Sequence, residues 1–194
     1  MKKWLFLIII CLGLSNNIYA DNNTAPELTK EQKKAIEKRN REIQDSIYHA
    51  TAAEAMAKGF YVLMADRIMI KGRAFMNPTP NTNFILIQGD NAIIQLAANN
   101  GRTGLNGLGG ITVEGKINGL KGGIPDKKGK ITYNFGVSGP AISAQVHITL
   151  YGEDNQATAI VSPNFWSGNL TVYGRIVPYE EVDYEKAIKG TSFP

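Results

Sequence analysis

The feature that most constrains this chain is a two-residue alternation of apolar and polar side chains along its second half. The alternation is clearest in Ile111–Glu114, Ile131–Phe135 and Gln145–Leu150. Successive side chains of a strand point to opposite faces of a sheet, so a period of two indicates strands with one buried and one solvated face. We therefore expect a domain rich in antiparallel sheet, where this pattern is common.

Three earlier runs are apolar at nearly every position, so they need cover on both faces. These runs are Phe60–Ala65, Phe84–Ile87 and Ala92–Leu96. Two further strands are expected, at Gln156–Ser162 and Leu170–Val177. About eight or nine short strands at this spacing are typical of an antiparallel β-sandwich or a partly closed β-barrel, and the residues leave both open.

One long helix is expected before the first strand. Thr29 is a good N-cap, and Gln32 three residues later completes a capping-box pattern. Lys58 and Gly59 supply a basic last turn and a glycine stop. The predicted fold class is therefore α+β, with an N-terminal helix followed by the antiparallel β domain. The expected segments are a charged N-terminal helix over 21–59, the β domain over 60–178 as one fold with the helix, and a charged tail over 179–194.

Only the second half of this helix has an apolar face. Ile43, Ile47 and Ala50 follow helical spacing, with Ala53 and Met56 beside them. We expect this face to be buried and to cover one face of the apolar strands. The first half is mostly charged with both signs interleaved, so it is expected to be a solvated arm.

The beginning of the chain has the layout of a secretory signal peptide. Lys2 and Lys3 precede the apolar run Trp4–Leu14, and a more polar stretch leads to Ala20 and Asp21. The run is well short of the roughly 20 residues of a permanent transmembrane helix. We therefore expect cleavage between Ala20 and Asp21, which removes residues 1–20. We also expect export to the periplasm or cell envelope, without a permanent transmembrane span.

Cysteine content and net charge exclude further classes. The only cysteine, Cys11, lies in the apolar run and follows Ile8–Ile10, whereas lipoprotein signals place a small residue before the modified cysteine. We therefore expect neither a lipid anchor nor a disulfide in the folded domain. The net charge of +4 falls to +2 when Lys2 and Lys3 leave, which is too close to neutral to indicate a nucleic-acid partner.

The glycine-rich stretch Gly101–Gly110 lacks the surroundings of a phosphate-binding loop. Such loops precede a helix and commonly contain Gly-Lys followed by Ser or Thr. Here a strand follows, so a flexible or bulged connection is expected. The two histidines, His49 and His147, have no second ligand at metal spacing, and no metal or other cofactor is expected.

Two features are candidates for a ligand site. His147 is expected on the polar face of its strand beside Thr149, where a surface histidine is a simpler interpretation than a catalytic base. Phe165 and Trp166 lie together in a loop. Such a pair either anchors a partner or folds back over the end of the sheet.

Particular residues also carry a resemblance to a known family. Tyr61–Arg67, and Ser162–Asn164 followed by Leu170–Ile176, resemble the domain of unknown function 4251 family, whose members are small exported proteins common in the Bacteroides group. The resemblance covers about Lys30–Pro178. It implies a β-rich extracytoplasmic domain and brings no activity with it. Members often carry Leu-Pro-Tyr-x-Gly in the middle, and this chain departs from that pattern at Leu96–Gly101.

These observations favour a non-enzymatic binding module of the periplasm or cell envelope. Its ligand is expected to be apolar or amphipathic, or an envelope partner, held at an open end of the sheet. Two alternatives remain. One is a hydrolase whose site is assembled from distant segments around His147, and the other is an interaction subunit that docks through the N-terminal helix.

Overall fold

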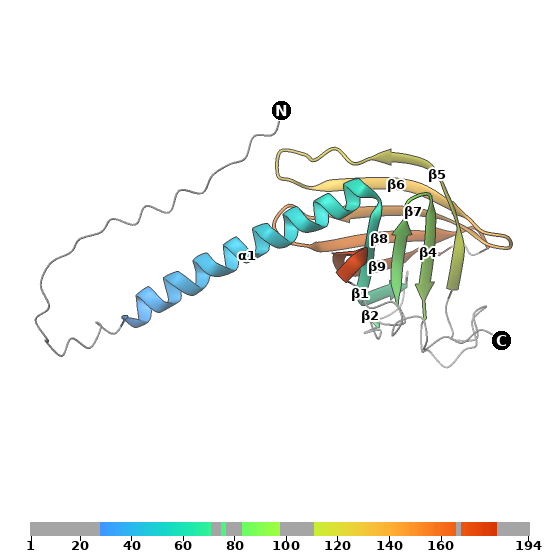
Figure 1. Ribbon diagram of the computed structural model, residues 1–194. Helices are drawn as coiled ribbons and strands as arrows, with labels where there is room; N and C mark the ends of the chain where they lie inside the picture. Colours follow the sequence, from blue (N-terminus) through green and yellow to red (C-terminus); the bar gives the residue numbers. More distant parts are fainter. Residues whose placement is uncertain (1–27, 71–74, 77–82, 98–110, 166–167, 182–194) are drawn as a thin grey trace, which may run out of the picture. The chain divides into compact units, whose positions relative to one another are not determined.

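Helix α1 (Lys30–Lys58) precedes the strands in the computed structural model, which describes residues 28–70, 75–76, 83–97, 111–165 and 168–181 (Figure 1). The expected capping box starts the helix, because the N–H of Gln32 donates to Thr29 Oγ1 at 3.2 Å and the N–H of Thr29 donates to Gln32 Oε1 at 3.0 Å. Gly59, with φ at 73°, follows its end. The chain divides into two units, residues 1–37 and residues 38–194, and the second contains the rest of α1 and all the strands.

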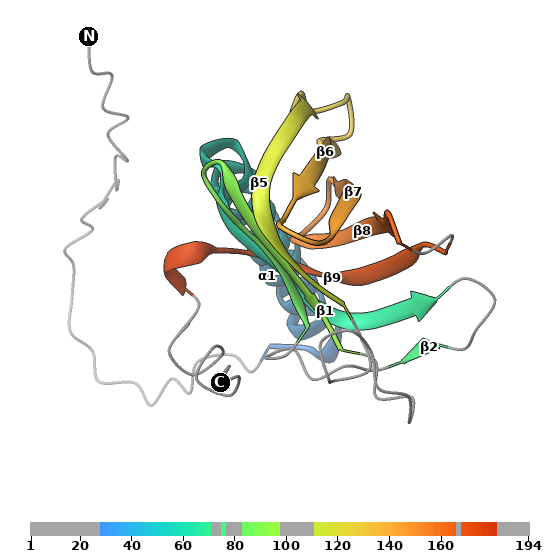
Figure 2. The same ribbon diagram turned by 90° about the vertical axis from the view of Figure 1, so that its right-hand side faces the viewer.

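Antiparallel strands follow α1, as the alternation predicts. Their bounds are β1 (Phe60–Ile70), β2 (Phe75–Met76), β3 (Phe84–Gln88), β4 (Asn91–Leu96), β5 (Ile111–Gly122), β6 (Ile131–Ser138), β7 (Ser143–Leu150), β8 (Gln156–Pro163) and β9 (Leu170–Pro178), followed by the 3-10 helix η2 (Tyr179–Glu181). Strands β1 and β3 to β9 pair in chain order, and β1 also pairs with β9, so eight strands close into a barrel (Figure 2). Among the described strands, the short β2 pairs with β1 alone. The α+β fold class is confirmed, with a closed barrel rather than an open sandwich.

The apolar residues of the alternating pattern fill the interior of this barrel. Leu63, Ile94, Ile148 and Val172 are fully buried and belong to one cluster that draws residues from all eight strands. Small barrels are filled by side chains in this way. The described interior is therefore filled by side chains.

The helix meets this core with a different face from the one expected. Three residues within Ala52–Met56 are buried and belong to the barrel cluster, whereas Ile43 and Ile47 are 50% and 52% exposed and Ala50 is also exposed. The prediction is wrong for Ile43, Ile47 and Ala50, whereas Met56 is buried and Ala53 packs against the cluster, as expected for the second half of the helix. The small side chains of Ala52 and Ala55, with Met56, fit against the barrel, and the shape of this surface decides which stripe of the helix is buried.

A second apolar cluster lies on the outer face of the barrel and explains the runs that are apolar on both faces. Val62, Phe84 and Leu86 point outward from β1 and β3 and are buried. Val177 and Tyr179 pack against them, from the end of β9 and from η2. Outer cover therefore comes from the C-terminal end of the β domain, while α1 covers part of the inner cluster.

The pairing of β1 with β9 closes the barrel and is specific in its backbone geometry. A β-bulge at Asp66 interrupts the register, and Gly174 lies opposite it. A Cβ atom at Gly174 would lie 1.9 Å from the carbonyl oxygen of Met64, so only glycine fits there. The Arg175 guanidinium donates to both carboxylate oxygens of Asp66, at 3.2 and 3.3 Å, and links the two strands on the outer face.

Candidate functional site

A groove of about 640 Å³ lies on the outer face of β3, β4 and β5 and extends to the residues that follow β6. A volume of this size is in the range of small-molecule sites. The residues that line it are Leu86, Gln88, Asn91, Ala92, Ile93, Glu114, Gly115, Lys116, Ser138 and Pro140.

The groove forms near Lys116, where the pairing of β5 with β4 ends and its pairing with β6 begins. Lys116 pairs with Asn91 of β4 and also with Ser138 of β6, and the residues before it pair with β4 while those after it pair with β6. At this corner a Cβ atom on Gly115 would lie 2.1 Å from the carbonyl oxygen of Ser138. On the other side, a Cβ atom on Gly139 would lie 2.4 Å from the carbonyl oxygen of Glu114. Two glycines therefore allow the close backbone crossing that ends the groove.

The groove has an apolar floor and a polar rim. Leu86 and Ile93 belong to the outer apolar cluster, so the floor continues a packed hydrophobic surface. Glu114 and Lys116 are exposed and lie two residues apart on β5, so both point to the outer face. Such a site suits a ligand with an apolar body and a polar or charged end.

A second hollow, of about 500 Å³, lies between α1, the turn from β7 to β8, and the end of β9. His49 of α1 approaches the same turn, with its Nδ1 atom 3.1 Å from the carbonyl oxygen of Asp154. A Cβ atom on Gly129 would lie 3.2 Å from the Nε2 atom of His49. This imidazole therefore fits between two turns at the place where the helix docks on the barrel, and we assign it a structural role.

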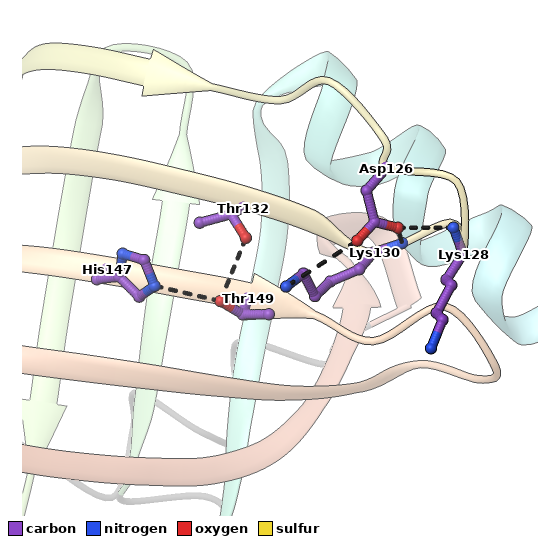
Figure 3. A network of polar contacts seen from close by, with 6 residues as sticks. All are labelled: Asp126, Lys128, Lys130, Thr132, His147 and Thr149. Atoms are coloured by element: carbon purple, nitrogen blue, oxygen red, sulfur yellow. Dashed lines mark hydrogen bonds and ion pairs between the residues drawn. The ribbon is translucent and has the colours of Figure 1, made fainter.

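His147 lies on the outer face of β7, as expected, within a row of polar side chains (Figure 3). Its Nδ1 atom contacts the Oδ1 atom of Asn134, and its Nε2 atom lies 3.3 Å from the Thr149 hydroxyl oxygen. That hydroxyl is in turn 3.4 Å from the hydroxyl oxygen of Thr132. The partners of His147 are thus an amide and a hydroxyl, and His147 does not line the groove.

The other expected site residues are only partly described. Phe165 is 47% exposed after the end of β8 and does not line the groove, whereas Trp166 lies outside the described residues. Gly101–Gly110, Cys11, Ala20 and Asp21 also lie outside them. Within the described part of the chain, no group of three or more His, Cys, Asp or Glu side chains could hold a metal ion. No helix among those residues has both the length and the apolar character to cross a membrane.

Sequence reasoning did not find the groove residues as a site. Their signal was indirect: Leu86 and Ile93 lie in the runs that are apolar on both faces, which indicated outward-facing apolar residues that need cover. Gly115 and Gly139 carried no local signal that they would meet, because the contact depends on the path of β5 between two neighbours.

Comparison with known proteins gives a family match. Residues 43–176 match the family described as "Domain of unknown function (DUF4251)". The chain is also similar to a DUF4251 family protein from Bacteroides eggerthii of known crystal structure, with 34% sequence identity and a TM-score of 0.66. The similarity covers 78% of this chain and 99% of that chain. A comparison with curated proteins finds no match.

Proposed function

The chain belongs to the DUF4251 family, as its residues predicted, and since that family is described as one of unknown function we propose a role from the geometry of this chain itself. We propose a non-enzymatic binding module that holds an apolar or amphipathic ligand in the outer groove of β3 to β6. The supporting observation is the apolar floor at Leu86 and Ile93 below a rim that carries Glu114 and Lys116.

The packed core supports an outer site over an inner one. The inward-facing side chains of all eight strands form one buried cluster, so a ligand inside the barrel would have to displace close-packed residues. In the groove, by contrast, a ligand of moderate size meets exposed rim residues and the partly exposed Ile93, below which Leu86 is buried. Burial of apolar ligand area there contributes about 25 cal/mol per Å².

The proposed place of action is the periplasm or cell envelope. Support comes from the sequence, where Lys2 and Lys3 precede the apolar run Trp4–Leu14 and a polar segment begins at Asp21. Edman sequencing of the protein recovered from its host is expected to start at Asp21. Recovery of an intact N-terminus from the cytoplasmic fraction would contradict export.

Native mass spectrometry of the protein purified from its own host tests the ligand. A retained small molecule is expected on the wild-type chain. Ile93→Glu places a charge on the groove floor, so it is expected to abolish retention, because an ionised carboxylate next to an apolar ligand loses its hydration. Ile160→Glu is the matched control, since Ile160 also points outward, from β8, and is 37% exposed away from the groove.

An amphipathic dye gives an independent measurement. Anilinonaphthalene sulfonate is expected to bind the folded wild type and the Ile160→Glu control with similar affinity. Binding to Ile93→Glu is expected to fall at least tenfold. Repeated recovery of the wild type as an empty chain, together with equal dye binding by both variants, would overturn the proposed site.

A hydrolase centred on His147 is the second candidate. One observation favours it: the imidazole has an amide oxygen at Nδ1 and a hydroxyl at Nε2, the order of partners found in catalytic triads. Against it, the hydroxyl belongs to Thr149 on the same strand, and the groove lies elsewhere. A screen of esterase, glycosidase and peptidase substrates tests it, with His147→Ala expected to abolish any turnover. If the wild type turns over none of these substrates, this candidate fails.

A further inference from the structure

The hairpin formed by β5, β6 and their connecting loop carries two exposed aliphatic side chains among lysines. We propose that this hairpin, residues 118–130, docks on an anionic lipid surface. The proposal is independent of the groove, whose residues lie on β3 to β6 before and after this segment.

A β-bulge places the first aliphatic side chain, Leu120, in solvent. Asn118 pairs with Gly136 and Lys121 pairs with Asn134, so β5 has one more residue than β6 in this interval. Gly119 has φ at 63°, in the left-handed region that glycine tolerates. A bulge of this kind changes the direction of a neighbouring side chain, and Leu120 is 58% exposed.

The second aliphatic side chain, Ile124, is exposed by the turn that follows. Gly122 and Gly123, directly before Ile124, have φ at 107° and 88°, and Pro125 directly follows Ile124. A Cβ atom on Gly122 would lie 2.0 Å from the carbonyl oxygen of Thr132, so the backbone requires glycine there. Ile124 is 84% exposed, more than any other large apolar residue recorded as exposed in the described chain. Backbone geometry that depends on glycine therefore keeps Leu120 and Ile124 outside the core.

The same segment has a positive charge that its acidic residue does not neutralise. Lys121, Lys127 and Lys128 are exposed, and no ion pair is recorded for their side chains within the described residues. Asp126 is used internally, because its Oδ1 atom accepts from the N–H groups of Lys128 and Lys130 at 2.8 and 3.0 Å (Figure 3). These hydrogen bonds hold the pKa of Asp126 below its usual value, and the Lys130 ammonium lies 4.0 Å from its other oxygen.

This combination fits the interface of a bilayer. Aliphatic side chains enter the boundary between headgroups and acyl chains, while lysines remain at the level of anionic headgroups. Pairing with a protein strand fits less well, although Asn118–Gly122 pairs only with β6 and leaves its other edge unpaired in the described sheet. Lys121 lies on this edge, and lysine on an edge strand opposes strand addition.

Vesicle flotation tests the proposal on the protein recovered from its host. Vesicles of phosphatidylcholine with phosphatidylglycerol are compared with vesicles of phosphatidylcholine alone. The wild type is expected to bind the anionic vesicles more tightly, and salt is expected to weaken this binding. All variants are recovered from the same host in the same way, so any contribution of the N-terminal segment to vesicle binding is the same throughout.

Two sets of substitutions separate the apolar and the charged contributions. Leu120→Ser with Ile124→Ser is expected to weaken binding at least tenfold. Its control is Ile43→Ser with Ile47→Ser, because these helix residues are also aliphatic and at least half exposed. The charge set is Lys121→Gln, Lys127→Gln and Lys128→Gln. It is expected to weaken binding about a hundredfold, since each lysine near an anionic membrane raises the binding constant about fivefold. Its control is Lys30→Gln, Lys34→Gln and Arg39→Gln, which lowers the net charge equally.

Circular dichroism spectra identical to that of the wild type show that each variant is folded. Loss of binding in the hairpin variants, with less than threefold change in both controls, supports the proposal. Equal losses in hairpin and control variants, or equal wild-type binding to both vesicle types, overturn it. Binding to polyglutamate that needs the three lysines but not Leu120 or Ile124, with no vesicle binding, also overturns it and indicates an acidic protein partner.

Discussion

At the scale of single residues, Tyr61 is a titratable group inside a hydrophobic barrel. It points inward from β1 and is 3% exposed, and no hydrogen bond of its hydroxyl is recorded among the described residues. Burial is the main cause that raises its pKa, and the neighbouring Tyr133 adds to the effect. Folding therefore requires this phenol to stay neutral.

The raised pKa of Tyr61 predicts a loss of stability in alkali. In the unfolded chain the phenol ionises near pH 10, so its contribution to stability is complete below that pH and is lost as the pH rises towards the folded pKa. Tyr61→Phe is expected to change the free energy of unfolding by less than about 1 kcal/mol at pH 7. At pH 11 the variant should be more stable than the wild type. Urea unfolding at both pH values measures this, with Tyr151→Phe, at an exposed tyrosine, as the control substitution.

Residue types alone identified several environments and missed others. The polar neighbours of His147 and the capping box at Thr29 were predictable, because both depend on neighbours close in sequence or on the alternation of one strand. The groove floor at Ile93 was not, because it depends on strands that meet only in the folded barrel. Exposure of Leu120 was equally hidden, since a bulge depends on the pairing of two strands.

At the scale of elements, the docking face of α1 shows the limit of reading hydrophobicity around a helix. Ile43 and Ile47 form the more apolar stripe, yet the buried contact is made by residues within Ala52–Met56. Periodicity locates a stripe, but the complementary surface decides which stripe is used. His49 also lies on the side of α1 that faces the barrel, because its imidazole contacts the turn from β7 to β8.

Substitutions on the two faces of α1 should therefore have unequal effects. Met56→Ala removes a side chain that is 2% exposed, and it is expected to lower the free energy of unfolding by about 2–5 kcal/mol. Ile47→Ala removes an exposed side chain and is expected to cost less than about 1 kcal/mol. Chemical denaturation of both variants decides between the faces. A larger loss of unfolding free energy for Ile47→Ala would show that the helix face with Ile43 and Ile47 makes the stabilising contact.

The hypothesis of an interaction subunit that docks through α1 is also tested at this scale. Residues 30–44 are all exposed, so deletion of residues 21–42 is expected to leave the melting temperature within about 2 °C of the full chain. If the arm recruits a partner, a protein that copurifies with the full chain from its host should be missing from the deleted one. Identical copurifying proteins in both preparations would exclude docking through this arm.

At the scale of the whole β domain, one cluster connects all eight strands, so the barrel should unfold as a single unit. Ile148→Ala empties a fully buried position on β7 and is expected to cost about 2–5 kcal/mol while keeping one cooperative transition. Ile160→Ala on the neighbouring β8 is the control, because its side chain points outward, and it should cost less than about 1 kcal/mol. Calorimetry with two separate transitions would contradict a single core.

The number and direction of the strands could be predicted from the sequence, whereas the closure of the barrel could not. Alternation fixes which side chains of a strand share a face, but it carries no information on which strand becomes the neighbour of the first. Closure depends on the β-bulge at Asp66 and on the close backbone contact at Gly174. Both are properties of a pairing between the two ends of the β domain.

That pairing has a consequence for the order of folding. Because β1 and β9 are hydrogen-bonded neighbours, the backbone N–H and C=O groups on one edge of β1 have no strand partner until β9 is in place. Contacts so distant along the chain slow folding, and the waiting strand is exposed to self-association. A chain truncated before Leu170 should thus remain open to proteases, whereas a chain that extends to Pro178 should be protected.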